Sequence, residues 1–399
     1  MNDIQTSGRF GDLINWYYDS RCKKVTLSGT GKLEGSFNEI VYPYSRDVRE
    51  VEILNGITAI DDSVFRRAKM RAIIIPNSVT SIGAYAFQQC ENLERIKLGY
   101  GLQRIGKGAF LLSRLPRVVY VDYLDVLLNV VYSDQLSNPF YYEGGKVYLD
   151  GDLLQGINIP GSMQTVGKYQ YYGYRGLSVV RLNEGITRID DYAFCDCGDL
   201  SSLIIPNSVK SIGVRSISWC NSLNHITIPG SVTFIDNEAF MCCQGLSDLT
   251  IMNGVERIGD RAFMGCLRLL SVTIPESVKQ IGQYAIGYMP EEKEGEGVTK
   301  IQDFTIIGKK GTEAQRYANS CKIHFKDIDE LARTVPPFSS QPKAVVKQKS
   351  IFLEQQIAAM LKVNSGITVG SVVATLSRKY DNSEVCKAMC EYLKDQYLV

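Results

Sequence analysis

The stretch IPNSVTSIGAYAFQQCENL, residues 75–93, decides the fold because its pattern returns along the chain at a fixed spacing. The isoleucine of its seven-residue phrase SIGAYAF recurs at Ile82, Ile105, Ile189, Ile212, Ile235, Ile258 and Ile281. Each step from Ile189 to Ile281 is 23 residues, as is the step from Ile82 to Ile105. Self-similarity at one period is typical of solenoids, whose stacked repeats share one continuous core.

Each period has its own internal order of apolar residues. A Cys-x-x-Leu segment follows the phrase, and then apolar residues alternate with polar ones, as at Ile226 and Ile228. Alternation at a period of two predicts a strand with one buried face. The strand often ends at a proline, such as Pro206 or Pro229, which lacks the N–H that would extend the ladder. We therefore predict one coil per period, made of a strand, a turn, a short strand and a compact bend.

The chain resembles the BspA-like (treponemal-type) leucine-rich repeat family. The family hallmark Ile-Pro-x-Ser-Val-x-x-Ile-Gly-x-x-Ala-Phe-x-x-Cys-x-x-Leu is met almost letter for letter from Ile75 to Leu93. Segments 16–44, 138–160 and 305–325 resemble the family's N-terminal cap, internal hairpin insertion and array-closing unit. The resemblance covers about 16–326. It implies a repeat solenoid, mainly β with short turns and helical bends, that serves as a surface or secreted adhesin or as an interaction module.

The period and its interruptions give the expected domain organisation. We predict an N-terminal cap over 1–50, the leucine-rich repeat solenoid over 51–326, a linker over 327–344 and a three-helix unit over 345–399. An insertion at about 111–155 breaks the period and contains two strand-like apolar runs, 117–121 and 126–132, interpreted as an elaborated coil plus a hairpin. The charged segment 289–297 is expected to be a solvated loop, with an acidic docking loop as the alternative.

The last 55 residues have a different pattern. Prolines 336, 337 and 342 mark the linker, and apolar residues then recur at helical spacing in three segments. The order of the segments looks somewhat like a winged-helix domain, which would offer a DNA-reading helix. That helix carries Glu384, Lys387, Glu391 and Lys394, and mixed charge faces phosphates poorly. A protein-interaction or capping bundle is favoured. Nucleic-acid binding would be possible only through residues 345–399, and homo-oligomerisation through these helices is a further possibility.

Composition and charge exclude some classes of protein and suggest a location. The net charge of +1 gives no strong global field toward nucleic acid or membrane. The N-terminal residues lack a basic run followed by an apolar core, and no stretch approaches 18 consecutive apolar residues. With eleven cysteines and no export signal, we expect reduced thiols in a cytoplasmic protein, with the cell surface as the alternative.

No catalytic or metal-binding pattern is expected. His225 and His324 are far apart in sequence and lack a nearby nucleophile pattern. The phased cysteines, one per coil, predict a column of small apolar side chains at the inward bend, since zinc would need four convergent ligands. Cys386 and Cys390 are predicted to be semi-buried on one helical face, with a redox or interface role as the alternative. We therefore expect no enzyme activity, no metal and no cofactor.

The candidate binding surface is the strand face, because solenoids bind through the continuous surface of their aligned strands. The predicted outward-facing contact residues are Arg95, Lys97, Arg181, His225, Thr227, Asp248, Thr250 and Thr273. This column begins basic and becomes neutral, which suggests a partner with an acidic patch near Arg95, Lys97 and Arg181; the alternative is that these are ordinary solvated residues. The sequence predicts a non-catalytic protein-recognition or scaffolding protein. The alternatives are a surface-exposed adhesin and a regulator whose winged-helix-like unit binds DNA.

Overall fold

A computed structural model describes residues 7–113, 118–140, 146–291 and 297–334 of the chain. The chain divides into two compact units, Met1–Asp329 and Glu330–Val399. The first unit holds the predicted solenoid and is described below. The predicted three-helix unit at 345–399, with any DNA-reading helix, lies outside the described residues.

The N-terminal cap is an antiparallel meander that begins a long sheet. Its strands are β1 (Ser7–Phe10), β2 (Ile14–Asp19) and β3 (Lys24–Gly29). Two short helices follow it, α1 (Phe37–Ile40) and η1 (Tyr44–Arg46). Trp16 and Tyr18 are buried against the solenoid core. Strand β3 then pairs in parallel with the first strand of the array, so the cap covers the edge that a bare solenoid would expose.

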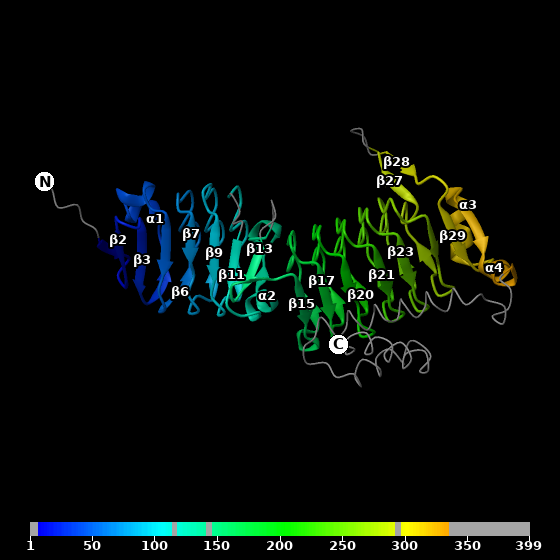
Figure 1. Ribbon diagram of the computed structural model, residues 1–399, viewed down its shortest axis with the longest axis horizontal. Coiled ribbons are helices and arrows are strands. Elements are labelled where there is room, and N and C mark those ends of the chain that lie inside the picture. Colours follow the sequence, from blue (N-terminus) through cyan, green and yellow to red (C-terminus); the bar gives the residue numbers. More distant parts are fainter. Residues whose placement is uncertain (1–6, 114–117, 141–145, 292–296, 335–399) are drawn as a thin grey trace, which may run out of the picture. The chain divides into compact units, whose positions relative to one another are not determined.

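The first part of the array builds two parallel sheets, one for each strand of the coil (Figure 1). The longer strands are β5 (Glu50–Ile53), β7 (Ala72–Ile74), β9 (Arg95–Leu98), β11 (Val118–Val121) and β13 (Lys146–Leu149). The shorter strands are β4 (Gly31–Leu33), β6 (Ile57–Ile60), β8 (Ser81–Ile82), β10 (Arg104–Ile105) and β12 (Val131–Tyr132). All neighbours pair in parallel except β14 (Asp152–Leu153), which turns back on β13 and ends its sheet.

The second part of the array repeats the coil, but its longer strands form two separate sheets, one of three strands and one of five. Its longer strands are β15 (Gly156–Ile159), β17 (Val179–Leu182), β19 (Ser202–Ile204), β21 (His225–Ile228), β23 (Asp248–Ile251), β25 (Ser271–Thr273), β29 (Thr305–Gly308) and β30 (His324–Asp327). Its shorter strands form one sheet of β16 (Thr165–Val166), β18 (Arg188–Ile189), β20 (Ser211–Ile212), β22 (Phe234–Ile235), β24 (Arg257–Ile258) and β26 (Gln280–Ile281). A 3₁₀ turn η3 (Gly161–Met163) and helix α3 (Glu313–Cys321) complete it. Helix α4 (Ile328–Thr334) follows β30 and includes the boundary between the two units. The predicted period-23 β-solenoid is confirmed.

The structure departs from the expectations at two places. The apolar run 126–132 is not a strand throughout, because α2 (Asp125–Asn129) precedes the two-residue β12, and η2 (Gln135–Ser137) follows. A continuous apolar run does not distinguish a buried helical turn from a strand, since both bury successive residues. The charged segment is not simply a loop, because β27 (Tyr288–Pro290) and β28 (Val298–Lys300) pair as an antiparallel hairpin. Residues 292–296 between them lie outside the description.

Aromatic rings stack along the inside of the bends. Phe65 and Phe87 lie 5.4 Å apart between ring centroids, and Phe87 and Phe110 lie 5.3 Å apart, with planes within 7° of parallel. Phe240 and Phe263 repeat the contact at 5.0 Å. The equal spacing of the coils places the rings of neighbouring coils over one another, and Ile217 and Ile286 fill the same position in two coils that lack a ring.

The backbone of each bend alternates in hand. Tyr85 and Gln89 have left-handed φ values of 57° and 58°, and equivalent positions in later coils do the same. With this alternation, the N–H groups of residues 85, 87 and 89 all point toward the next coil. There they donate to the carbonyls of residues 107, 109 and 111 at 2.8–2.9 Å. Left-handed backbone costs a non-glycine residue roughly 1–2 kcal/mol. The ladder offsets this strain, because it satisfies donors that the interior would otherwise leave unpaired.

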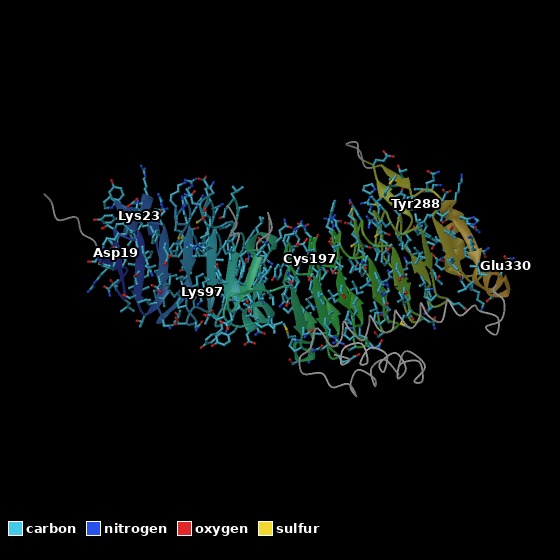
Figure 2. The ribbon with its side chains drawn as sticks, viewed as in Figure 1. Asp19, Lys23, Lys97, Cys197, Tyr288 and Glu330 are labelled. Carbon is cyan, nitrogen blue, oxygen red and sulfur yellow. The ribbon has the colours of Figure 1, made fainter. Side chains whose placement is uncertain are left out.

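The phased cysteines line the same corner and are buried. Cys197, one of them, is labelled in Figure 2. They also make hydrogen bonds that the sequence did not predict. The Cys90, Cys197 and Cys243 thiols each donate to a main-chain carbonyl of the preceding coil at 3.0 Å, and Cys220 and Cys266 do so at 3.2 and 3.4 Å. Each acceptor lies 25 or 26 residues earlier in the chain. A thiol at this position therefore fills space like a small apolar residue and satisfies a buried carbonyl.

We expect the buried thiols to make stability fall at alkaline pH. Burial raises the pKa of Cys90 to about 12 and the pKa values of Cys195 and Cys242 to about 11, against 9.0 for an unperturbed thiol. Their contribution to stability is complete below pH 9. Above it the unfolded chain loses protons that the folded chain keeps, so the free energy of unfolding falls, by up to about 1.4 kcal/mol per pH unit for each thiol.

Urea unfolding between pH 8 and 10 measures this slope. Cys90→Ala should flatten it, whereas removal of the exposed thiol in Cys22→Ser should leave it unchanged. A slope that is identical in Cys90→Ala and in the parent chain would contradict the assignment.

The two parts of the array meet at a junction held by side chains. Within the described residues, no strand pairing joins β14 to β15 or β12 to β16. Gln170, only 3% exposed, takes the place of the ladder. Its Nε2 donates to the main-chain carbonyls of Leu127, at 3.1 Å, and Leu128, and its Oε1 accepts from the Gly167 N–H at 2.7 Å.

A second polar side chain supports the same junction. Asn138 is fully buried, and its Nδ2 donates to the Tyr169 carbonyl at 2.7 Å. Beside it, the rings of Phe140 and Tyr174 stack at 5.3 Å. The hydrophobic core thus continues across the junction while the main-chain ladder does not.

Candidate protein-binding surface

The strand face presents every second residue of the longer strands. Because neighbouring strands pair in parallel and in register, equivalent residues of successive coils form rows across the sheet, with a spacing of about 4.8 Å. His225 lies opposite Asp248, and Thr227, Thr250 and Thr273 are register partners in turn. All of the predicted contact residues alternate with buried ones, which places their side chains on this face.

The basic residues predicted near one another are divided between two sheets. Arg95 and Lys97 lie on β9 of the nine-stranded sheet, whereas Arg181 lies on β17 of a separate three-stranded sheet. Lys97, labelled in Figure 2, is paired with Asp122, with Nζ and Oδ2 2.9 Å apart. Its charge is therefore largely balanced. Arg95 is exposed and has no ion pair within the described part of the chain.

His225 is held by two neighbours on the same face. Its Nδ1 lies 2.8 Å from Asp248 Oδ2, and its Nε2 lies 3.3 Å from the Thr227 hydroxyl. If Nδ1 carries the proton, it donates to the carboxylate, and Nε2 accepts from the hydroxyl. The connectivity is that of a hydrolase triad, but the His225 and Asp248 side chains are 53% and 66% exposed. The three side chains therefore form an exposed polar cluster on the strand face.

Four tyrosines share the strand side of the array and were not predicted as contacts. Tyr120 lies on β11 and Tyr148 on β13, while Tyr100 and Tyr123 follow the ends of β9 and β11. The signal available in the sequence was a tyrosine count of 23, which fits both strand-rich structure and adhesive surfaces and does not distinguish between them. Their positions depend on which strands become neighbours.

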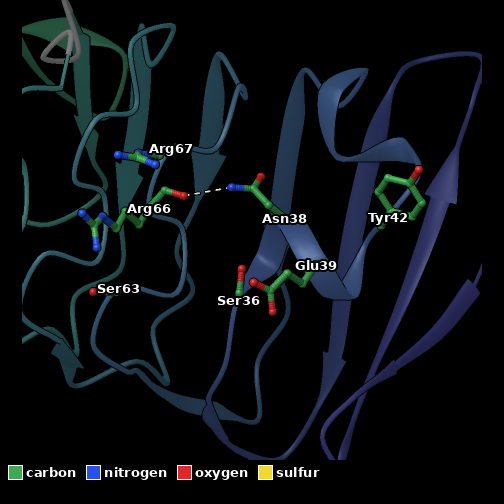
Figure 3. Close-up of a pocket in the computed structure, with 7 residues that line it drawn as sticks. All are labelled: Ser36, Asn38, Glu39, Tyr42, Ser63, Arg66 and Arg67. Carbon is green, nitrogen blue, oxygen red and sulfur yellow. Dashed lines mark hydrogen bonds between the residues drawn. The ribbon is translucent and has the colours of Figure 1, made fainter.

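A hollow lies on the bend side of the first coils (Figure 3). It is lined by Ser36, Asn38, Glu39, Tyr42, Ser63, Arg66 and Arg67. Asn38 Nδ2 donates to the Arg66 carbonyl at 2.9 Å, and Arg67 Nε donates to Gln89 Oε1 at 2.7 Å. Tyr42 is 76% exposed, and Glu39 and both arginines are also exposed. The hollow is open to solvent and mixes a carboxylate with two guanidinium groups, so it does not select a ligand charge.

The described residues also bear on metal and membrane binding. Among them, no group of three or more histidine, cysteine, aspartate or glutamate side chains is placed to hold a metal ion. None of the helices in the described ranges is long and apolar enough to cross a membrane.

Several solved structures are similar to this chain. A leucine-rich repeat protein from Eubacterium ventriosum is 19% identical, with 75% of this chain and 98% of that one covered and a TM-score of 0.38. A leucine rich cell surface protein from Faecalibacterium prausnitzii is 17% identical, with 82% and 96% covered and a TM-score of 0.36. The pneumococcal vaccine antigen PcpA is 14% identical, with 80% and 99% covered and a TM-score of 0.45. Among curated proteins, none matches the chain.

The repeat itself identifies the family. The sequence profile of the BspA type leucine-rich repeat region matches residues 16–136 and 146–266, with six copies. These residues make up more than half of the chain, and they form the cap, strands and bends described above. The chain therefore belongs to the BspA-type leucine-rich repeat family.

Proposed function

We propose that this protein is a non-catalytic recognition or scaffolding protein that binds a protein partner through the strand face of its solenoid. The observation that carries the proposal is the set of in-register rows on that face. These rows place threonines beside threonines and tyrosine beside tyrosine, and they also present single arginine and histidine side chains. Tyrosine and arginine are enriched in the energetically dominant parts of protein interfaces. A rigid row of such side chains loses little conformational entropy on binding.

The contact residues proposed for this surface are those predicted from the sequence, together with the four tyrosines. Arg95, Lys97 and the tyrosines belong to the first part of the array. The second part supplies Arg181, His225, Thr227, Asp248, Thr250 and Thr273. The first group is charged and aromatic, whereas Thr250 and Thr273 offer small hydroxyl side chains. Different parts of one partner, or two partners, would meet these surfaces.

Affinity capture with matched variants tests the proposal. Protein partners are captured from native lysate with the full chain, and the affinity of the captured partner is then measured by titration. Arg95→Glu combined with Thr250→Glu alters the strand face and should weaken binding at least tenfold. Arg104→Glu combined with Thr233→Glu makes the same changes at exposed positions of the short-strand side and should leave affinity unchanged. Equal effects of the two pairs, or no loss with the first, would contradict the use of the strand face.

Two alternatives remain predictions with their own tests. A surface-exposed adhesin should be labelled on intact cells by a membrane-impermeant reagent, whereas the predicted cytoplasmic protein should not be. A regulator that binds DNA through residues 345–399 should show steeply salt-dependent binding that a chain ending at residue 335 has lost.

A further inference from the structure

Two pairs of tyrosines lie on neighbouring coils, Tyr100 with Tyr123 and Tyr120 with Tyr148, and we call the four residues the tyrosine patch. Tyr100 and Tyr123 are 53% and 54% exposed, and Tyr120 is 37% exposed. Large aromatic side chains left in solvent contribute nothing to the core. An exposed cluster of them is typical of a surface that binds.

The rings of the patch are organised by the coils beneath them. Tyr120 and Tyr148 are register partners on β11 and β13, and their ring centroids lie 5.6 Å apart. Tyr100 and Tyr123 meet edge to face, with centroids 5.4 Å apart and planes at 86°. Figure 1 places β9, β11 and β13 side by side, so the two pairs belong to three successive coils. The rings hold each other in place before any ligand arrives.

The repeat does not require tyrosine at these positions. In the turn that contains Tyr100, other coils carry Asn77, Asn207 or Gly230. In the strand row of Tyr120, the second part of the array carries Thr227 and Thr250. Small residues therefore satisfy the coil geometry, and the repeat does not require tyrosine at these four positions.

Cationic side chains border the patch. Val118 on β11 has Arg95 on one side and Lys146 on the other as its register partners. Both cations are exposed, and neither has an ion pair within the described ranges. Lys97 is the register partner of Tyr120, and its charge is balanced by Asp122. The face therefore offers one cationic row and, two residues further along the strands, one aromatic row.

We propose that the tyrosine patch, with Arg95 and Lys146, binds an extended acidic segment of a partner protein. The inference rests on the proposed function and names the partner chemistry. Two residues along a strand span about 7 Å, and the same spacing separates residues i and i+2 of an extended peptide. A carboxylate at position i meets the cationic row, where arginine forms charge-assisted hydrogen bonds. An aromatic or proline side chain at position i+2 packs on Tyr120 and Tyr148.

Selection from a phage-displayed library of random dodecapeptides on the immobilised full chain tests this inference. The expected result is enrichment of peptides with aspartate or glutamate two positions before an aromatic residue or proline. One enriched peptide is then synthesised with a fluorophore, and its affinity is measured by anisotropy. Tyr120→Thr combined with Tyr148→Thr removes the aromatic row and should weaken peptide affinity at least tenfold. Threonine is chosen because other coils carry it in this row. Arg95→Ala should weaken it and reduce its dependence on salt.

A matched control lies in the same row of the same sheet. Tyr17 on β2 is 53% exposed, and its register partner Thr26 on β3 pairs with Glu52 on β5, several strands before Tyr120. Tyr17→Thr should leave peptide affinity unchanged, and circular dichroism checks that each variant is folded.

Several outcomes would overturn the inference. Enriched peptides without the acidic–aromatic spacing would do so, as would equal binding by the Tyr120→Thr/Tyr148→Thr variant. If no peptide is enriched, the full chain is applied to a glycan array. Binding to glycans that Tyr120→Thr abolishes would show that the ligand is a carbohydrate and not a peptide. If the Arg95→Glu/Thr250→Glu chain still loses its captured protein partner after such a failure, the proposed function stands and only the partner chemistry is wrong.

Discussion

Replacement of Gln170 by leucine is expected to lower the free energy of unfolding by about 3–5 kcal/mol. The side chain is buried, and it makes hydrogen bonds to three main-chain groups at the junction of the two parts of the array. Leucine has a similar volume and fills the space, but it leaves two carbonyls and one N–H without partners. Each unsatisfied buried group costs about 1–3 kcal/mol. No strand ladder crosses the junction in the described residues. The substitution therefore weakens the contact that couples the two parts of the array.

Urea unfolding followed by circular dichroism measures this loss. The transition should also broaden or divide into two, because coils cooperate only through their neighbours. The control is Gln103→Leu, which makes the same change at an exposed position before β10. This control should shift stability by less than about 0.5 kcal/mol. A Gln170→Leu chain within about 1 kcal/mol of the parent would mean that the hydrogen bonds do not hold the junction.

Replacement of Phe87 by alanine is expected to cost about 3–5 kcal/mol, the usual range when a buried phenylalanine is truncated. The Phe87 ring is fully buried and stacks on Phe65 and on Phe110. Its removal opens a cavity between two coils whose spacing is fixed by their main-chain ladder. The walls of the cavity therefore have little freedom to close.

Thermal and urea unfolding of Phe87→Ala and Phe87→Leu test this prediction as a pair. Leucine keeps most of the buried apolar volume and should recover more than half of the lost stability. Equal losses in the two variants would indicate that the aromatic stack itself, and not the filled volume, stabilises the bends. A loss under about 1.5 kcal/mol in both would show that the coils close over the gap.

Much of the solenoid could be predicted because the same sequence pattern recurs in most coils, and each copy predicts the same strands and bend. The alternation at Ile226 and Ile228 predicts the strand, and the spacing of Ile189 and Ile212 predicts that coils stack in register. The insertion was harder to predict because it has no period. Its run 126–132 is apolar without a clear period, and both a one-turn helix and a strand can bury such a run of side chains.

The candidate surface was predicted in part. Alternation along β9 placed Arg95 and Lys97 outside, and the structure agrees on their exposure. Two relationships could not be predicted from single coils. Arg181 proved to belong to another sheet, and Lys97 is paired with Asp122 from the neighbouring coil. Both depend on which segment follows β9 in space, and the interrupted repeat hides that order.

By itself, the sequence determined the family, the period, the buried face of each coil and the inward column of cysteines. These are local properties that every coil repeats. A single coil exposes too much apolar surface to fold alone, so the repeated coils must stack on one another. Only the tertiary structure decided which side chains meet across coils. It gave the thiols their carbonyl acceptors, placed Gln170 at the junction and paired tyrosine rings from neighbouring coils. Such contacts join residues 20 or more positions apart, and their geometry depends on the stacking of whole coils and not on any local pattern.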